Sequence, residues 1–301
     1  MKKASLRKSK AIRRKVTRRE AQINSIGILG VGLIGGSIAE RLRAERNPAL
    51  IYGYDRPGVL SVAKAQNVID RKLASPAHAL ASCDLIVLSA NPLTNKKFLK
   101  RLAASRTQSQ ALIIDTGSTQ LSIVRLAESL DWKNSARFVA GHPMAGRERE
   151  GLKNRIGDLF VGHPFFFDDG PKLSKLNRAR LSWFTGELGA YPLFVDPEKH
   201  DAIMTDISHL PQLVSTSLAS FVAHHPSKYL ALAGTGLQSM IRLGGSPYTN
   251  WDDVFKENQE KITLRLTELI ANLIEMRDSI SKGDSVSIYF KQARRSYRCL
   301  W

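Results

Sequence analysis

The sequence predicts an α/β protein in which a doubly wound parallel sheet is followed by an all-helical domain. Three observations predict this fold class. Short apolar segments with the length of buried strands alternate with amphipathic segments of helical period between residues 26 and 195. A glycine-rich loop follows the first apolar segment. Beyond Pro197 the strand-like segments cease, and long segments with helical periodicity continue almost to the C-terminus.

The first apolar segment leads directly into a loop with the glycine spacing that binds dinucleotides. The segment is Ile26–Leu29, and the loop consists of Gly30, Val31, Gly32, Leu33, Ile34 and Gly35. The first glycine permits a tight turn, the second lets the backbone approach a pyrophosphate, and the third lets the next helix pack close to the strand. The N-terminus of that helix then presents its free amide groups to the phosphates.

The second strand-like segment, residues 50–54, ends in Asp55 and Arg56. An acid at this place hydrogen-bonds the ribose hydroxyls of NAD and repels the 2′-phosphate of NADP, whereas an arginine can pair with that phosphate. We therefore expect a Rossmann domain over residues 23–195 that binds NAD through the glycine loop, Asp55 and Arg56. NADP is the alternative cofactor.

The alternation of strands and helices continues along the chain. Further strands are predicted over residues 84–89, 111–115, 138–140, 165–167 and 191–195. Helices are predicted between them over residues 57–66, 93–104 and 176–188. Strands that are apolar throughout are typical of a parallel sheet buried on both faces. The second domain, residues 196–301, is predicted to be helical over residues 200–224, 229–242, 251–278 and 286–298.

Two polar residues follow predicted strands and are candidate catalytic residues. Ser118 comes after the strand at 111–115, and His142 lies in a Gly-His-Pro segment that is expected to be a loop after the strand at 138–140. Ligands of open α/β sheets bind at the carboxyl ends of the strands. Ser118 can equally be the N-cap of the following helix, and His142 an ordinary surface histidine.

An apolar surface in the second domain predicts self-association. The segment predicted as the longest helix carries more apolar residues than a solvent-facing helix needs: Leu264, Leu266, Leu269, Ile270, Leu273 and Ile274. Such a surface is buried between helices or between subunits. We expect a homodimer formed through the helical domain.

The charge of the chain is concentrated at its N-terminus. Half of the formal net charge of +18 lies in residues 1–22, which contain ten Lys or Arg and one acidic residue. We expect a flexible basic arm there, for which a solvated arm, non-specific contact with a polyanion and an organelle transit peptide are the three interpretations. The remaining positive charge suits an enzyme whose cofactor and substrate are both anions.

Composition excludes several other classes. No apolar segment is long enough to span a membrane, and we expect no membrane partner and no bound metal. Cys83 and Cys299 are too few and too far apart for a disulfide framework, which favours a reducing cytoplasm. Apart from non-specific contact by the basic arm, we do not expect nucleic-acid binding.

Taken together, the motifs resemble those of the prephenate and arogenate dehydrogenases of tyrosine biosynthesis. The resemblance extends from Ile23 to the C-terminal helix. It rests on the glycine loop with Asp55-Arg56, Asp115-Thr116-Gly117-Ser118, residues 141–146 with Glu148, His200-Asp201 followed by residues 208–211, and Arg242 with Trp251 and Asn258. Unrelated Rossmann enzymes share only the first of these motifs.

The resemblance implies an oxidative decarboxylation of a small dicarboxylate, in which prephenate becomes 4-hydroxyphenylpyruvate and a hydride passes to NAD. His142 would accept the proton of the ring hydroxyl, and Ser118 would align that hydroxyl. His209 would contact the substrate side chain, Arg242 would hold a carboxylate, and Glu148 would lie at the mouth of the site.

The sequence also departs from the family pattern. Gln212 stands where many members have a second histidine, and Gln238 stands where a basic residue is common. The loss of that charge weakens the usual preference for a dicarboxylate, although Arg147 can partly restore it. Arogenate and 4-amino-4-deoxyprephenate therefore remain alternative substrates.

Two other functions compete with this interpretation. A dehydrogenase of the hydroxyisobutyrate type would share the two-domain layout, but its expected catalytic lysine in a glycine-rich motif of the helical domain is missing from this sequence. A polyanion-binding protein on a degenerate Rossmann scaffold would use the basic arm. The intact glycine loop and His142 argue against it.

Overall fold

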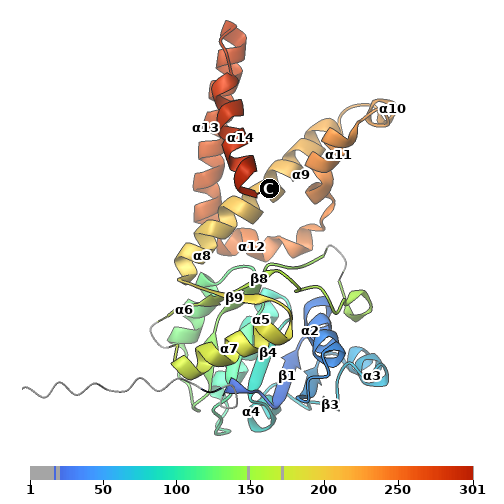
Figure 1. Ribbon diagram of the computed structural model, residues 1–301, viewed down its shortest axis with the longest axis vertical. Helices are drawn as coiled ribbons and strands as arrows, with labels where there is room; N and C mark the ends of the chain where they lie inside the picture. Colours follow the sequence, from blue (N-terminus) through green and yellow to red (C-terminus); the bar gives the residue numbers. More distant parts are fainter. Residues whose placement is uncertain (1–16, 18–20, 148–149, 171–172, 301) are drawn as a thin grey trace, which may run out of the picture. The chain divides into compact units, whose positions relative to one another are not determined.

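A computed structural model describes residues 17, 21–147, 150–170 and 173–300 of the chain (Figure 1). The chain divides into two compact units, Met1–Pro197 and Glu198–Trp301. The basic arm predicted over residues 1–22 and the candidate site residue Glu148 lie outside the described residues, apart from Thr17, Ala21 and Gln22 of the arm. None of the described helices has the length and apolar character needed to cross a membrane.

The first unit is built on the predicted parallel sheet. It has six strands in the order β3-β2-β1-β4-β5-β6. The strands are β1 (Ser25–Leu29), β2 (Leu50–Tyr54), β3 (Arg71–Lys72), β4 (Leu85–Leu88), β5 (Leu112–Asp115) and β6 (Arg137–Val139). Every neighbouring pair is parallel. The strand order therefore reverses between β1 and β4, and sheets of this type bind ligands at that point.

Helices cover both faces of this sheet. They are α2 (Leu33–Ala44), α3 (Pro57–Ala65), α4 (His78–Ser82), α5 (Pro92–Ala104), α6 (Leu121–Ser129) and α7 (Lys175–Glu187). Alternate strand residues belong to different cores: Leu85 and Val87 pack with α2, α3 and α7, whereas Ile86 and Leu88 pack with α4, α5 and α6. Burial on both faces explains why the strands are apolar throughout. The short elements β3 and α4 were not predicted.

A second sheet corrects two expectations. It contains β7 (Gly141–Pro143), β8 (Pro164–Asp168) and β9 (Tyr191–Val195), and β7 runs antiparallel to β8. The alternation of strands and helices had predicted that residues 165–167 and 191–195 would continue the first, parallel sheet. The Gly-His-Pro segment had been assigned to a loop, but its three residues pair with Phe165, Phe166 and Phe167 of β8.

The second unit consists of helices. Its elements are α8 (Pro197–Met204, which begins at the end of the first unit), the π-helical turn η2 (Thr205–His209), α9 (Leu210–Val222), α10 (Ser227–Leu230), α11 (Thr235–Ile241), η3 (Arg242–Gly245), η4 (Tyr248–Asn250), α12 (Asp252–Glu257), α13 (Gln259–Lys282) and α14 (Ser287–Leu300). Three of the four predicted helices are therefore interrupted. Pro211, which has no backbone N–H to donate, lies in the first turn of α9 and accounts for the π-helical turn between α8 and α9.

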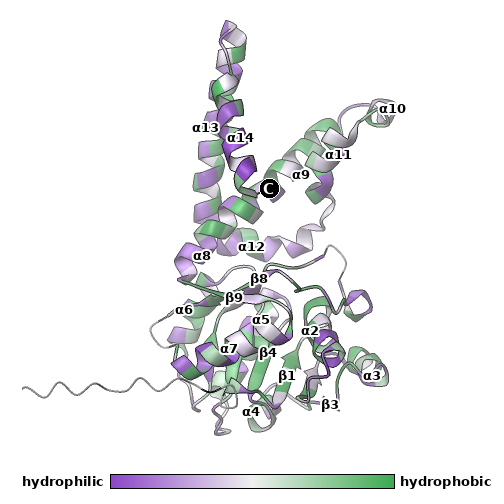
Figure 2. Cartoon of the chain, in the orientation of Figure 1, coloured by the Kyte–Doolittle hydropathy of each residue, from purple (hydrophilic) through white to green (hydrophobic). Residues whose placement is uncertain are grey.

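Much of the apolar surface of α13 is exposed to solvent in the single chain. Leu264, Ile270, Leu273 and Ile274 are 43–60% exposed, and Ile262 is the one buried residue of this helix. Figure 2 shows hydrophobic residues interspersed along the length of α13. Neighbouring helices of the same chain therefore leave this surface uncovered.

Candidate active site

The glycine loop has the geometry that its spacing predicts. Gly30 has a φ of +105°, and a Cβ added there would lie 2.6 Å from the Ala90 nitrogen. A Cβ at Gly35 would lie 2.2 Å from the Gly30 oxygen, whereas one at Gly32 would meet nothing within 4 Å. Gly32 is also the N-cap residue of α2. The loop thus leaves open space at a helix N-terminus, which fits the pyrophosphate of a dinucleotide.

Asp55 at the end of β2 is bonded to this loop. Its Oδ2 accepts a hydrogen bond of 2.8 Å from the Val31 N–H, and its Oδ1 accepts one of 2.7 Å from the Arg56 N–H. The Asp55 side chain is 18% exposed and that of Arg56 is 87% exposed. The carboxylate is therefore held at the edge of the loop, and the exposed Arg56 side chain pairs with it, with 3.8 Å between Arg56 Nε and Asp55 Oδ1.

Ser89 and Asp115 hydrogen-bond the segments of this candidate site, although the sequence assigned no role to Ser89 and named Asp115 only as part of a motif. Ser89 Oγ donates a hydrogen bond of 2.9 Å to the Gly30 carbonyl. The buried Asp115 accepts hydrogen bonds from the N–H groups of Gly117, at 3.1 Å, and Gly141, at 2.9 Å. One carboxylate thus holds the turn before Ser118 and the start of the strand that carries His142.

Ser118 does not cap the following helix. Helix α6 begins at Leu121 with Gln120 at its N-cap position, so the N-cap interpretation of Ser118 is wrong. Ser118 is half-buried in the connection after β5.

His142 is the middle residue of β7 and is half-buried. Its ring stacks near that of Phe166 on the neighbouring strand, with 6.5 Å between ring centroids. Strand pairing therefore fixes the backbone of His142. The glycine loop, Ser118 and the start of β7 follow the carboxyl ends of β1, β5 and β6, which lie at one edge of the parallel sheet.

The second unit holds a buried histidine. His209 is 1% exposed and its Nδ1 lies 3.2 Å from Asn258 Nδ2. The ring contacts Trp251 edge-on, with 6.2 Å between ring centroids. Burial lowers the pKa of His209 to about 4, opposed by the charge of Asp201 and assisted by that of His200. The imidazole is therefore neutral near pH 7.

Arg242 begins the short helix η3 and its side chain is exposed. Two residues of α9 hold this turn: Gln212 Nε2 donates a hydrogen bond of 2.9 Å to the Leu243 carbonyl, and Ser215 Oγ accepts one of 3.0 Å from the Gly244 N–H. Helix α9 thus joins the segments that carry His209 and Arg242. Gln238 and Arg147 are exposed as well, and Gln238 Nε2 donates a hydrogen bond to the Ala233 carbonyl.

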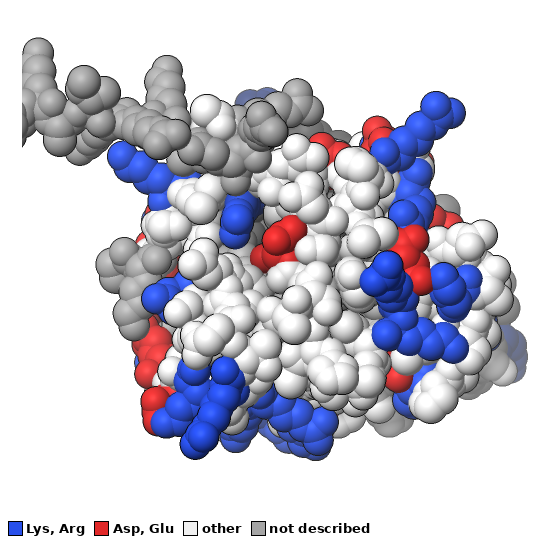
Figure 3. Space-filling view, turned by 90° about the horizontal axis from the view of Figure 1, so that it is seen from below, with Lys and Arg blue, Asp and Glu red and all other residues white. Residues whose placement is uncertain are grey.

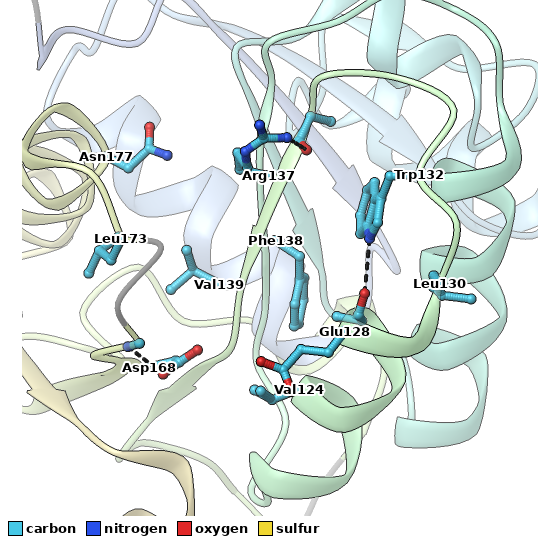
Figure 4. Close-up of a pocket in the computed structure, with 13 residues that line it drawn as sticks. Val124, Glu128, Leu130, Trp132, Arg137, Phe138, Val139, Asp168, Leu173 and Asn177 are labelled. Carbon is cyan, nitrogen blue, oxygen red and sulfur yellow. Dashed lines mark hydrogen bonds between the residues drawn. The ribbon is translucent and has the colours of Figure 1, made fainter.

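A cavity of about 600 Å³ lies elsewhere in the first unit (Figure 4). Its lining comes from α6, β6 and the connection between them, and from the end of β8 to the start of α7; it includes Glu128, Trp132 and Asp168. No predicted site residue lines it. Among the described residues, no group of three or more His, Cys, Asp or Glu side chains is placed to hold a metal ion.

Both units match domains of one enzyme family. Residues 38–183 match the nucleotide-binding domain of prephenate dehydrogenase, and residues 196–291 match its dimerization domain. The chain is 28% identical over 277 residues to prephenate dehydrogenase of Bacillus subtilis, covering 90% of this chain and 74% of that protein. It is 25% identical to cyclohexadienyl dehydrogenase of Zymomonas mobilis, covering 90% of this chain and 94% of that protein.

Solved structures show the same similarity. Prephenate dehydrogenase from A. aeolicus, solved in complex with hydroxyphenyl propionate and NAD+, superimposes with a TM-score of 0.82 at 27% identity, covering 93% of this chain and 99% of that one. Synechocystis arogenate dehydrogenase has the same fold, with a TM-score of 0.78 at 24% identity over 92% of this chain and all of that one. The chain therefore belongs to the prephenate and arogenate dehydrogenases, the NAD(P)-dependent oxidoreductases of tyrosine biosynthesis.

Proposed function

We propose that this enzyme converts prephenate to 4-hydroxyphenylpyruvate, with NAD as the hydride acceptor. The observation that carries the proposal is the position of Asp115, which binds the segments of Ser118 and His142 beside the glycine loop. The protein groups proposed to align and deprotonate the ring hydroxyl are thereby attached to the same sheet edge as the nucleotide loop. The A. aeolicus relative, solved with NAD+ and a hydroxyphenyl ligand, supports this choice.

In the proposed reaction, Ser118 hydrogen-bonds the ring hydroxyl and His142 accepts its proton. The nicotinamide, when bound, takes the hydride from the carbon that carries this hydroxyl. The electrons of the bond to the ring carboxylate then remain in the ring as carbon dioxide leaves, and the new phenolate oxygen recovers a proton. His209 and Arg242 bind the carboxylates and the side chain of the substrate, so the fixed positive charge of Arg242 compensates anionic groups.

Arogenate is the second candidate substrate. Gln238 places a neutral amide where a basic residue is common in the family, and that amide bonds the chain's own backbone at Ala233. A substrate side chain that carries an ammonium group needs less positive charge around it than a keto acid does. This observation favours arogenate, and the catalytic roles of Ser118 and His142 are the same for both substrates.

We further propose that the active enzyme is a homodimer. The match of residues 196–291 to a dimerization domain supports this, as does the exposed apolar surface of α13. A second copy is the occupant that would cover this surface.

The replacement His142→Asn tests the catalytic assignment. Asparagine cannot accept the hydroxyl proton, so turnover should fall by roughly two to four powers of ten while the protein stays folded. In the wild type, turnover should fall as the pH drops, because only the neutral ring accepts a proton. Steady-state kinetics with prephenate and NAD measure both effects. Near wild-type turnover in the variant would remove His142 from the mechanism.

A further inference from the structure

Asn258 connects three parts of the helical unit through one buried amide. It lies between α12 and α13 and is 4% exposed. Its Nδ2 lies 2.9 Å from the Asp201 carbonyl oxygen, 2.8 Å from Thr205 Oγ1 and 3.2 Å from His209 Nδ1. Asp201 in α8 and the two ends of the π-helical turn, Thr205 and His209, therefore share one hydrogen-bonding group.

The partners of this amide determine which atom donates. A backbone carbonyl can only accept, so the nitrogen of Asn258 must face Asp201. The Thr205 hydroxyl donates its own proton to the same carbonyl, at 2.8 Å, and therefore accepts from Asn258. Asn258 is thus a donor toward all three neighbours, and its two N–H groups are shared among three acceptors.

This arrangement determines the tautomer of His209. A donor that faces Nδ1 requires a lone pair on that nitrogen, so the single proton of the neutral ring resides on Nε2. Nε2 is itself buried and has no hydrogen-bond partner among the described residues. A buried N–H without a partner costs free energy, and a ligand oxygen would remove that cost.

The charged and titratable groups around the ring agree with a neutral imidazole. His200 Nδ1 lies 2.8 Å from Asp201 Oδ1, and both side chains are buried. The influences of His200 and Asp201 on His209 are opposite in sign, and burial dominates both. The residues that flank α12, Trp251 before it and Asn258 after it, also contact the ring and carry no charge.

We propose that Asn258 is a positioning residue that holds His209 as the Nε2–H tautomer, so that the ring donates a hydrogen bond to an acceptor oxygen of the substrate side chain. The proposal rests on the proposed function for the contact between His209 and substrate. The group recognised is then a carboxylate or carbonyl oxygen. A group that only donates, such as an ammonium, would not be bound by this nitrogen.

The tautomer can be measured directly in the wild-type enzyme. Long-range proton–nitrogen correlation spectra of enzyme labelled with ¹⁵N-histidine distinguish a ring protonated on Nε2 from one protonated on Nδ1. The signal of His209 is assigned by its loss in His209→Gln. We expect the Nε2–H pattern at pH 7. A ring protonated on Nδ1 would overturn the proposal, and this result requires neither activity nor an Asn258 variant.

Asn258→Asp tests the role of the amide in binding. The aspartate carboxylate has the same shape but only accepts hydrogen bonds, so the single proton of the neutral ring should move to Nδ1. Nε2 then has no proton to donate to the substrate. We expect KM for prephenate to rise about tenfold, as for a lost hydrogen bond, while KM for NAD changes less than about twofold.

Thr205→Val is the matched control, because it removes a partner of Asn258 and leaves His209 Nδ1 untouched. It should lower the melting temperature and leave both the tautomer and KM as in the wild type. If Asn258→Asp and Thr205→Val raised KM for prephenate equally, Asn258 would have only a structural role, and the proposal would be overturned. If the enzyme is inactive toward prephenate and arogenate, the proposed function is contradicted. If the tautomer of His209 still depends on Asn258 in that enzyme, the positioning role of Asn258 is retained.

Discussion

Asp115 and Asn258 belong to the motifs that carry the family resemblance, but the sequence alone did not assign a role to either residue. Each is a small polar residue whose role depends on backbone groups far along the chain: Asp115 bonds Gly141, and Asn258 bonds Asp201. The glycine loop, in contrast, could be predicted because its requirements are local. Gly30 and Gly35 have no room for a Cβ, and this restriction is visible in the spacing itself.

Asp55 should determine the choice of cofactor. The variant Asp55→Asn retains an oxygen that can accept from the Val31 N–H but removes the negative charge that would repel a 2′-phosphate. We expect the wild-type enzyme to have a higher kcat/KM with NAD than with NADP. In the variant, the ratio of these two values should be about tenfold smaller, equivalent to ~1.4 kcal/mol.

Arg56→Ala is the control for this prediction, since its side chain is 87% exposed and can reach a phosphate. If Arg56 recognises NADP, its loss should lower efficiency with NADP alone. Wild-type enzyme that uses NADP as well as NAD would contradict the role assigned to Asp55.

At the scale of elements, the sequence predicted the six-stranded sheet better than the second sheet. β2 was predicted at its observed bounds, because an apolar run between helical segments has few other interpretations. β7 was missed because three residues containing glycine and proline have low strand propensity. Its pairing with β8 is a tertiary effect, and it changes His142 from a predicted loop residue to a strand residue.

The end of β8 should make stability depend on pH. Burial raises the pKa of Asp168, a hydrogen bond from the Gly170 N–H lowers it, and the charges of Asp196, Glu128 and Asp169 raise it; the net shift is upward. The folded state then binds the proton more tightly than the unfolded state, so the stability due to Asp168 is lost as pH rises through the folded pKa. Asp168→Asn should therefore raise the melting temperature at pH 7 and have less effect at pH 4.

Asp70→Asn is the control, because the pKa of Asp70 is shifted downward and its replacement should lower the melting temperature at pH 7. Burial alone would raise the pKa of Asp70, but hydrogen bonds from Arg43 and the Ile51 N–H, together with nearby positive charge, bring it below its ordinary value. This carboxylate stabilises the fold above its unfolded pKa, and the stabilisation is lost as pH falls. Thermal melts of both variants at pH 4 and pH 7 test the pair. A lower melting temperature of Asp168→Asn at pH 7 would contradict the upward pKa shift of Asp168.

At the scale of the whole molecule, one face of the first unit shows how the described charges are distributed. In the face of the first unit drawn in Figure 3, the described Lys and Arg side chains form separate groups, most of them toward the edge, and an acidic group lies near the centre among uncharged residues. Non-specific nucleic-acid binding requires a continuous basic surface. This face does not provide one.

The dimer can be tested on α13. Leu273 is 55% exposed, and a glutamate there would place a charge in the proposed interface. We expect wild-type enzyme to sediment with twice the chain mass of 33.4 kDa and Leu273→Glu to shift toward the monomer at micromolar concentration. Asn272→Glu, which lies on the polar face of the helix one turn after Glu268, should remain dimeric. A wild-type monomer, or equal behaviour of the two variants, would contradict this interface.

The proposed activity, NAD-dependent oxidative decarboxylation of prephenate, can be tested directly. The most direct measurement is the absorbance of reduced nicotinamide after the enzyme is mixed with NAD and either prephenate, arogenate or 4-amino-4-deoxyprephenate, with release of carbon dioxide followed in parallel. We predict equal amounts of reduced nicotinamide and carbon dioxide, with the highest kcat/KM for prephenate. Reduction without carbon dioxide, or no reduction with any of the three substrates, would contradict the account.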